Sequence, residues 1–183
     1  MNGRILVAGI GNIFLADDGF GCEVVRRLAE RELPENVGVR DFGIRGMDLA
    51  YALMDDHEAV IFVDATPRGG EPGTVYLIEA EVSEEGEAAI DTHGMDPVKV
   101  IRFARALGAE LPRTFVVGCE PEVILTGEAY DDMLMELSEP VKAALPEAVR
   151  MVESLVKEID AETKDETLKP DAANLKPSKE VRS

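Results

Sequence analysis

The sequence predicts an α/β fold, a three-layer sandwich in which helices cover both faces of a mostly parallel central sheet of about five strands. Two continuous apolar runs, residues 4–9 and 59–64, have the composition of strands that are buried on both faces. Stretches with helical spacing of apolar residues separate the strand-like runs. The connection between residues 64 and 74 is too short for a crossover helix, which predicts an antiparallel strand at one edge of the sheet.

Local signals set the expected limits of the elements. Pro34 ends the first helix. Asp96 and Pro97 supply an N-cap and a first-turn proline for a later helix, which stops at Gly108. The last helix carries apolar residues on one face up to Ile159. The expected strands are residues 4–9, 37–41, 59–64, 74–78 and 114–117, and the expected helices are 19–33, 49–54, 97–107 and 141–159.

The expected organisation is a single α/β domain, residues 1–159, followed by a charged tail, residues 160–183, that lacks apolar periodicity and is expected to be disordered. No signal peptide is expected, and no apolar stretch approaches the roughly 18 residues of a membrane span. The two cysteines are too few for a disulfide framework. We therefore expect a reduced, cytoplasmic protein, and a monomer.

The chain is strongly acidic, with 37 acidic and 19 basic residues and a net charge of −18. Such a surface repels phosphate backbones, so nucleic-acid binding is not expected. The charge favours a basic partner or a metal cation, although it also serves solubility alone.

Three polar residues lie where a strand is expected to end or a helix to begin. Asp18 follows the first strand, Asp64 ends the third, and His93 precedes the helix at Pro97. The carboxyl ends of strands in an open α/β sheet are where functional sites gather. Two carboxylates and one imidazole form a plausible site for a borderline divalent metal such as nickel or zinc.

The glycine-rich loop after the first strand also invites a dinucleotide-binding interpretation. The fingerprint requires a third glycine at the position of Phe14. A pyrophosphate would rest on the N-terminus of the following helix, where Asp17 and Asp18 would repel it. The same carboxylates suit a cation. The loop therefore argues against a nucleotide.

Each candidate also has a purely structural interpretation. Asp17 or Asp18 can be a helix N-cap, Asp64 can bond to a turn, and a lone loop histidine is often structural. Cys119 follows the last strand and can be a nucleophile, although no histidine is near it in sequence. The sequence contains neither G-x-S-x-G nor H-E-x-x-H, so ordinary serine or zinc protease chemistry is unsupported.

Over residues 4–122 the chain resembles the hydrogenase maturation proteases, endopeptidases that trim the C-terminus of nickel–iron hydrogenase large subunits. The segments that carry the resemblance are G-I-G-N-I-F-L-A-D-D-G-F-G, D-F-G-I-R-G-M-D-L, V-D-A-T, D-T-H-G-M-D-P and V-V-G-C-E-P-E. The first segment is the most specific of them. The tail after residue 159 lies outside the resemblance.

The resemblance implies a nickel-recognising triad of Asp18, Asp64 and His93, and substrate contact by Asp41, Gly43 and Gly46. It implies an aspartyl-type endopeptidase that cuts a large-subunit precursor once, after nickel insertion. The nickel belongs to that precursor, and a permanent metal in the protease is not required. Asp18 or Asp17 is then a candidate general base on water, and polarisation of the scissile carbonyl by the metal is the rival route.

Three alternatives stay open on the sequence. The triad also suits a nickel-sensing chaperone that docks on the large subunit without cutting it. An unrelated metal-dependent hydrolase would cleave small peptides without a hydrogenase precursor. A nucleotide or flavin enzyme on the same sheet is the third, against which the first loop argues.

Overall fold

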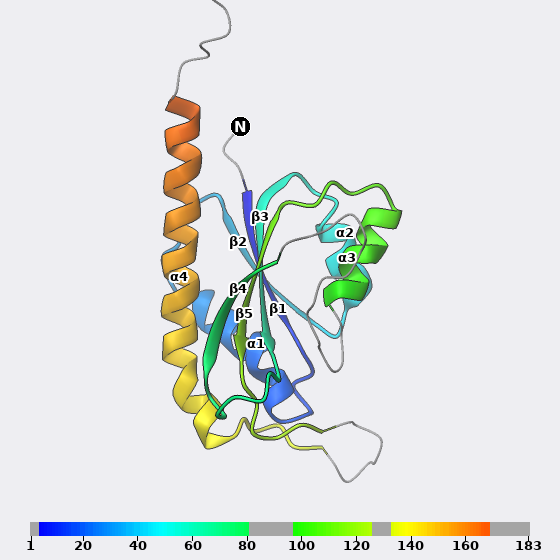
Figure 1. The fold of residues 1–183 in the computed structure, drawn as a ribbon, viewed down its shortest axis with the longest axis vertical. Coiled ribbons are helices and arrows are strands. Elements are labelled where there is room, and N and C mark those ends of the chain that lie inside the picture. Colours follow the sequence, from blue (N-terminus) through cyan, green and yellow to red (C-terminus); the bar gives the residue numbers. More distant parts are fainter. Residues whose placement is uncertain (1–3, 81–96, 126–132, 169–183) are drawn as a thin grey trace, which may run out of the picture.

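The structure is a computed structural model that describes residues 4–80, 97–125 and 133–168. Its elements alternate between strands and helices along most of the chain (Figure 1). They are β1 (Arg4–Ile10), η1 (Asp17–Gly19), α1 (Phe20–Leu28), β2 (Val37–Gly43), α2 (Gly46–Ala52), β3 (His57–Ala65), β4 (Val75–Glu79), α3 (Pro97–Ala106), β5 (Arg113–Cys119) and α4 (Glu139–Leu168).

The five strands form one sheet in the order β2-β1-β3-β5-β4. The first four are mutually parallel, and β4 pairs with β5 in the antiparallel direction at one edge. This confirms the predicted fold class and the antiparallel edge. Because the parallel strands run in the same direction, the loops that follow β1, β2, β3 and β5 emerge at the carboxyl end of these strands.

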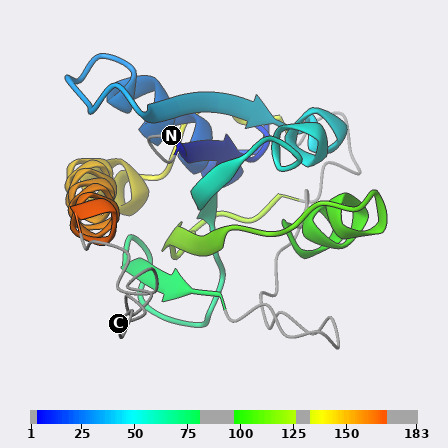
Figure 2. The same cartoon turned by 90° about the horizontal axis from the view of Figure 1, so that it is seen from above.

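Helices cover both faces of the sheet, as Figure 2 shows from above: α1 and α4 lie on one side, and α2 and α3 on the other. The core is divided in the same way. One cluster joins alternate residues of the strands to α1 and α4, and includes Phe20, Ile61 and Val152. The other joins the opposite strand residues to α2 and α3, and includes Phe62 and Leu49. The continuous apolar runs of the sequence are explained by burial on both faces.

The ends of the first and last helices differ most from the expectation. The first helix ends at Leu28 and does not reach Pro34. After Leu28, the amide of Arg31 bonds back only three residues, to the Leu28 carbonyl at 3.0 Å, so the last turn tightens and the chain leaves the helix. The spacing of Leu33 imitated a further turn, but that side chain is only half-buried.

The last helix continues past the expected boundary at residue 159 and ends at Leu168. Polar contacts replace apolar periodicity in this extension. Lys164 pairs with Asp160 one turn earlier at 2.6 Å, and Asn36 donates to Asp160 at 3.1 Å. The disorder expected from residue 160 is therefore wrong as far as Leu168, and residues 169–183 lie outside the described part.

A buried carboxylate directly after β5 ties the antiparallel edge to the sheet. Glu120 accepts the backbone N–H of Arg68 at 2.8 Å and the hydroxyl of Tyr76, in β4, at 2.9 Å. Burial alone would raise the pKa of Glu120, but these hydrogen bonds outweigh it and hold the pKa below its usual value. The loop that precedes β4 is thus closed onto the end of β5.

Gly21 lets α1 lie directly on the ends of two strands. A Cβ at this position would stand 2.1 Å from the Val63 carbonyl oxygen and 2.4 Å from the Ile10 carbonyl oxygen. Both neighbours are strand backbone and cannot move aside cheaply. The first helix, with the polar residues around it, is therefore held against the carboxyl ends of β1 and β3.

Replacing Gly21 with alanine should push α1 off the strands and lower the free energy of unfolding by about 3 kcal/mol, as overpacking does. Gly38→Ala is the matched control, because a Cβ there meets nothing closer than 4.0 Å; we expect its effect to stay within about 0.5 kcal/mol. Urea denaturation followed by circular dichroism measures both. Equal stability of the two variants would contradict the close approach.

Candidate active site

Polar residues from three elements lie at the carboxyl end of the parallel strands. Asp18 lies in η1 after β1, and Asp64 is the penultimate residue of β3. Asp41, near the end of β2, and Val63 of β3 are both in register with Gly9 of the intervening β1. The sheet therefore places Asp41 and Asp64 on the two sides of the strand whose loop carries Asp18.

The charges of these carboxylates all act on one buried thiol. Burial, together with the negative charges of Asp41, Asp18 and Asp64, raises the pKa of Cys22 to about 12. Cys22 lies in the first turn of α1, and its Sγ is 3.5 Å from the Gly11 carbonyl oxygen, to which it donates. Three carboxylates from different parts of the sequence thus act on a side chain at the start of α1.

Asp18 is a half-buried carboxylate held by its own loop. Its Oδ2 accepts the backbone N–H of Asn12 at 2.5 Å. Burial raises the pKa of Asp18 above its ordinary value, and the Asn12 bond partly opposes this. Gly11 makes the fold of the loop possible: its φ is +122°, and a Cβ there would lie 1.8 Å from the Asp18 carbonyl oxygen. Asp18 is thereby oriented by backbone geometry.

Asp64 is 5% exposed at the end of the central strand. Its register partner on β5 is Gly118, and the preceding residue, Val63, lies against Gly21 of α1. An ionisable group so buried needs hydrogen-bond partners or an opposing charge. Asp64 lies at the same end of the parallel strands as Asp18, and a site shared by the two carboxylates stays a prediction.

Asp17 has a different role from its neighbour. It is 0% exposed, and its Oδ2 accepts the backbone N–H groups of Glu122 at 2.9 Å and Val123 at 2.8 Å. Ser138 donates to both oxygens, from its backbone N–H at 2.7 Å and its hydroxyl at 2.9 Å. With four donors and no exposure, Asp17 is not available as a general base. Neither Asp17 nor Asp18 makes a side-chain cap bond to η1 or α1.

The segment expected to contact substrate forms the adjoining loop. The amide of Gly11 donates to the Gly43 carbonyl at 3.1 Å, and Gly43 has a φ of +53°. The Arg45 guanidinium bonds to the Asp41 carbonyl oxygen, and Gly46 begins α2. The structure thus places Asp41, Gly43 and Gly46 beside the first loop; their contact with substrate stays a prediction.

His93 lies outside the described residues, so the predicted triad is described only at Asp18 and Asp64. Within residues 4–80, 97–125 and 133–168, no group of three or more histidine, cysteine, aspartate or glutamate side chains is arranged to hold a metal ion. His57 begins β3, at the opposite end of the strand from Asp64, and its Nε2 is 2.9 Å from the Ala52 carbonyl.

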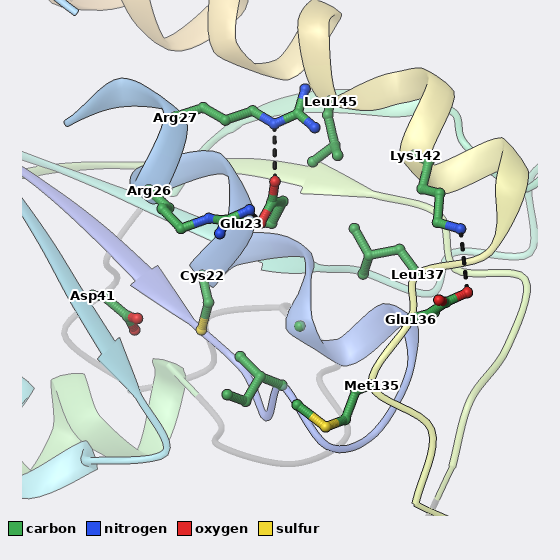
Figure 3. A pocket seen from close by; sticks show the side chains of 12 residues that line it. Cys22, Glu23, Arg26, Arg27, Asp41, Met135, Glu136, Leu137, Lys142 and Leu145 are labelled. Atoms are coloured by element: carbon green, nitrogen blue, oxygen red, sulfur yellow. Dashed lines mark hydrogen bonds and ion pairs between the residues drawn. The ribbon is translucent and has the colours of Figure 1, made fainter. Parts of the chain in front are cut away.

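A cleft of about 540 Å³ opens beside these residues (Figure 3). Its lining includes Cys22 and Asp41, and Figure 3 shows Met135 and Leu137 on a separate segment that leads into α4. Sequence reasoning missed this cleft. Its walls come from residues 13–41 and residues 135–145, which are distant in the chain and are joined by tertiary contacts such as the bond from Ser138 to Asp17.

The two cysteines are free and buried. Burial, together with the charges of Asp17 and Glu120, raises the pKa of Cys119 to about 12. A reactive cysteine requires a depressed pKa and access. The structure therefore argues against Cys119 as a nucleophile.

Comparison with known proteins decides the family. The family model described as hydrogenase maturation protease matches residues 22–155 of this chain. The chain belongs to the hydrogenase maturation protease family. Its resemblance to this family, predicted from the sequence segments, is thus confirmed, and family membership makes it a peptidase.

Relatives of this protease agree along most of its length. A hydrogenase expression/formation protein HupD of Rhizobium leguminosarum bv. viciae is 32% identical over 149 residues, which are 80% of this chain and 70% of that protein. The hydrogenase maturating endopeptidase HybD from E. coli superposes with a TM-score of 0.68 at 29% identity, covering 85% of this chain and 93% of HybD. A hydrogenase 2 maturation peptidase from a Thaumarchaeota archaeon gives 0.64 at 34% identity, with 84% and 98% covered.

No helix among the described residues of the protease is long and apolar enough to cross a membrane.

Replacing Asp17 with asparagine should lower the free energy of unfolding by about 3 kcal/mol, because an amide NH₂ would face buried donors. Asp18→Asn is the matched control. It should change stability by less than about 1 kcal/mol, since Asp18 is half-buried and its burial disfavours the charged form. Chemical denaturation measures both. A larger loss for Asp18→Asn would reverse the roles given to these neighbours.

Both cysteines should resist alkylation by iodoacetamide in the folded protein. A pKa of about 12 leaves a thiolate fraction of about 10⁻⁵ near pH 7, and both side chains are buried. The same reagent in urea should label both within minutes, which controls for reagent quality. Mass spectrometry counts the adducts. Rapid labelling of Cys119 under native conditions would revive its role as a nucleophile.

Proposed function

We propose that this protein is the endopeptidase that removes the C-terminal extension from the large-subunit precursor of a nickel–iron hydrogenase after nickel insertion. The proposal is supported by family membership together with one observation: Asp18 follows β1 and Asp64 is the penultimate residue of the neighbouring β3, so both lie at the carboxyl end of the parallel strands. The partner is the precursor. The nickel is part of that substrate.

Asp18, Asp64 and His93 recognise the nickel of the precursor. Oxygen and imidazole donors suit a borderline divalent ion. Three donors from the protease leave coordination positions for the ligands that the precursor supplies.

Asp18 acts as the general base on the attacking water. The backbone N–H of Asn12 donates to Oδ2 of this carboxylate and fixes its orientation. The water proton goes to Asp18 as the oxygen attacks the scissile carbonyl carbon. The proton is then delivered to the leaving amide nitrogen as the C–N bond breaks. Asp17 holds the surrounding loops and takes no proton.

A processing assay tests the proposal. Purified protease is mixed with nickel-loaded or nickel-free precursor, and the mass of the large subunit is followed. We expect loss of a C-terminal peptide only from the nickel-loaded precursor. Asp18→Asn should reduce the rate at least about 100-fold, as loss of a general base does. Asp56→Asn is the control, because this exposed aspartate precedes β3 at the end opposite to Asp64.

The outcomes separate the alternatives. Nickel-dependent binding of a competent precursor without any cleavage would replace the peptidase proposal with a nickel-sensing chaperone. Cleavage of small unrelated peptides would indicate a general hydrolase. Full activity of Asp18→Asn would overturn the assignment of the base.

A further inference from the structure

We propose that the cleft between α1 and residues 135–137 binds the part of the precursor that lies C-terminal to the cut, namely the extension that is released. This inference rests on the proposed function and adds the location of the leaving peptide. The occupant is an extended peptide segment with a free terminal carboxylate.

The cleft is continuous with the site. Gly19, the residue directly after Asp18 in η1, lines it together with Cys22 and Asp41. A chain whose scissile bond lies at Asp18 can therefore continue into the cleft without leaving the protein surface. Figure 3 shows Asp41 and Cys22 on one side and Lys142 with Glu136 on the other.

The size and lining of the cleft suit a short peptide. A volume of about 540 Å³ holds a few residues of extended chain and excludes a folded domain. Ile13, Leu137 and Leu145 supply apolar surface in the lining. Met135 is 65% exposed and Ile13 is 46% exposed, so their apolar surface is available to a ligand. Methionine adapts its shape to different apolar side chains.

The charges that line the cleft differ from those of the whole chain. The chain carries a net charge of −18, whereas the lining has three cations and three acids, which sum to zero. On α1, the guanidinium groups of Arg26 and Arg27 share the single carboxylate of Glu23, at 2.6 and 3.0 Å. The charge of Glu30, outside the lining, also acts on Arg26, so this part of α1 is close to neutral. A peptide carboxylate is repelled less there than by the acidic surface of the rest of the chain.

The far wall of the cleft is placed by the same loop that carries Asp18. The amide of Ala16 donates to the Leu134 carbonyl at 2.6 Å, and the amide of Leu134 donates to the Phe14 carbonyl at 3.1 Å. Asp17 binds Ser138 just beyond this wall. The distance between base and cleft is therefore set by backbone bonds, as a peptide held at both places requires.

Photo-crosslinking locates the leaving peptide. Met135 is replaced by the photoreactive residue p-benzoylphenylalanine in the full-length protein, which keeps Asp18, and the nickel-loaded precursor is irradiated with it directly after mixing. We expect the adduct on the C-terminal extension. The same residue in place of Met54, which is exposed beyond α2, should give no such adduct. Adducts only on the body of the precursor, or on a second copy of the protease, would overturn the inference.

A second test uses the terminal carboxylate. A synthetic extension peptide should inhibit processing competitively, and its C-terminal amide should inhibit about fivefold less, the size expected for one exposed charge contact. Arg26→Glu should abolish this difference and raise KM, while Arg150→Glu, an equal charge change on the exposed surface of α4, should leave both unchanged. Equal inhibition by acid and amide would overturn the inference. Failure of the unmodified protease to process any precursor would instead overturn the proposed function.

Discussion

The buried carboxylate of Asp17 is the interaction on which the rest of the site depends. It accepts four hydrogen bonds, from the backbone of Glu122 and Val123 and from both donors of Ser138. A fully buried carboxylate is tolerated only when donors replace its lost hydration. Those donors come from segments 105 and 121 residues away, so the first loop, the segment after β5 and the residue before α4 are placed together. Asp18 is the next residue in the chain, so the hydrogen bonds of Asp17 also fix its position.

Adjacent aspartates therefore divide two tasks. Asp17 accepts four hydrogen bonds and serves the fold, whereas Asp18 accepts the backbone N–H of Asn12 and is half-buried. Asp41, Asp18 and Asp64 also make the surroundings of the Cys22 thiol negative. Their negative charge raises the pKa of the thiol and suits the approach of a cation. This arrangement is consistent with a protease that reads a metal carried by its substrate.

Much of the fold could be predicted because the relevant signals are local. The apolar runs around β1 and β3 required burial on two faces, and the short connection before β4 ruled out a parallel crossover there. The strand ends then placed Asp18 and Asp64 at one edge. The predicted ends of the first and last helices were wrong. The observed ends, Leu28 and Leu168, depend on a tightened turn and on polar contacts such as that of Asn36 with Asp160. These contacts have no periodic pattern in the sequence.

By itself, the sequence determined the α/β class, the family and the two strand-end aspartates, since hydrophobic period and short motifs act over a few residues. Only the tertiary structure decided between Asp17 and Asp18, because the donors that occupy Asp17 are more than 100 residues distant. The tertiary structure alone also showed the cleft, whose walls come from α1 and residues 135–137. A pairing across such a separation is set by how whole elements pack, and a local pattern carries no record of it.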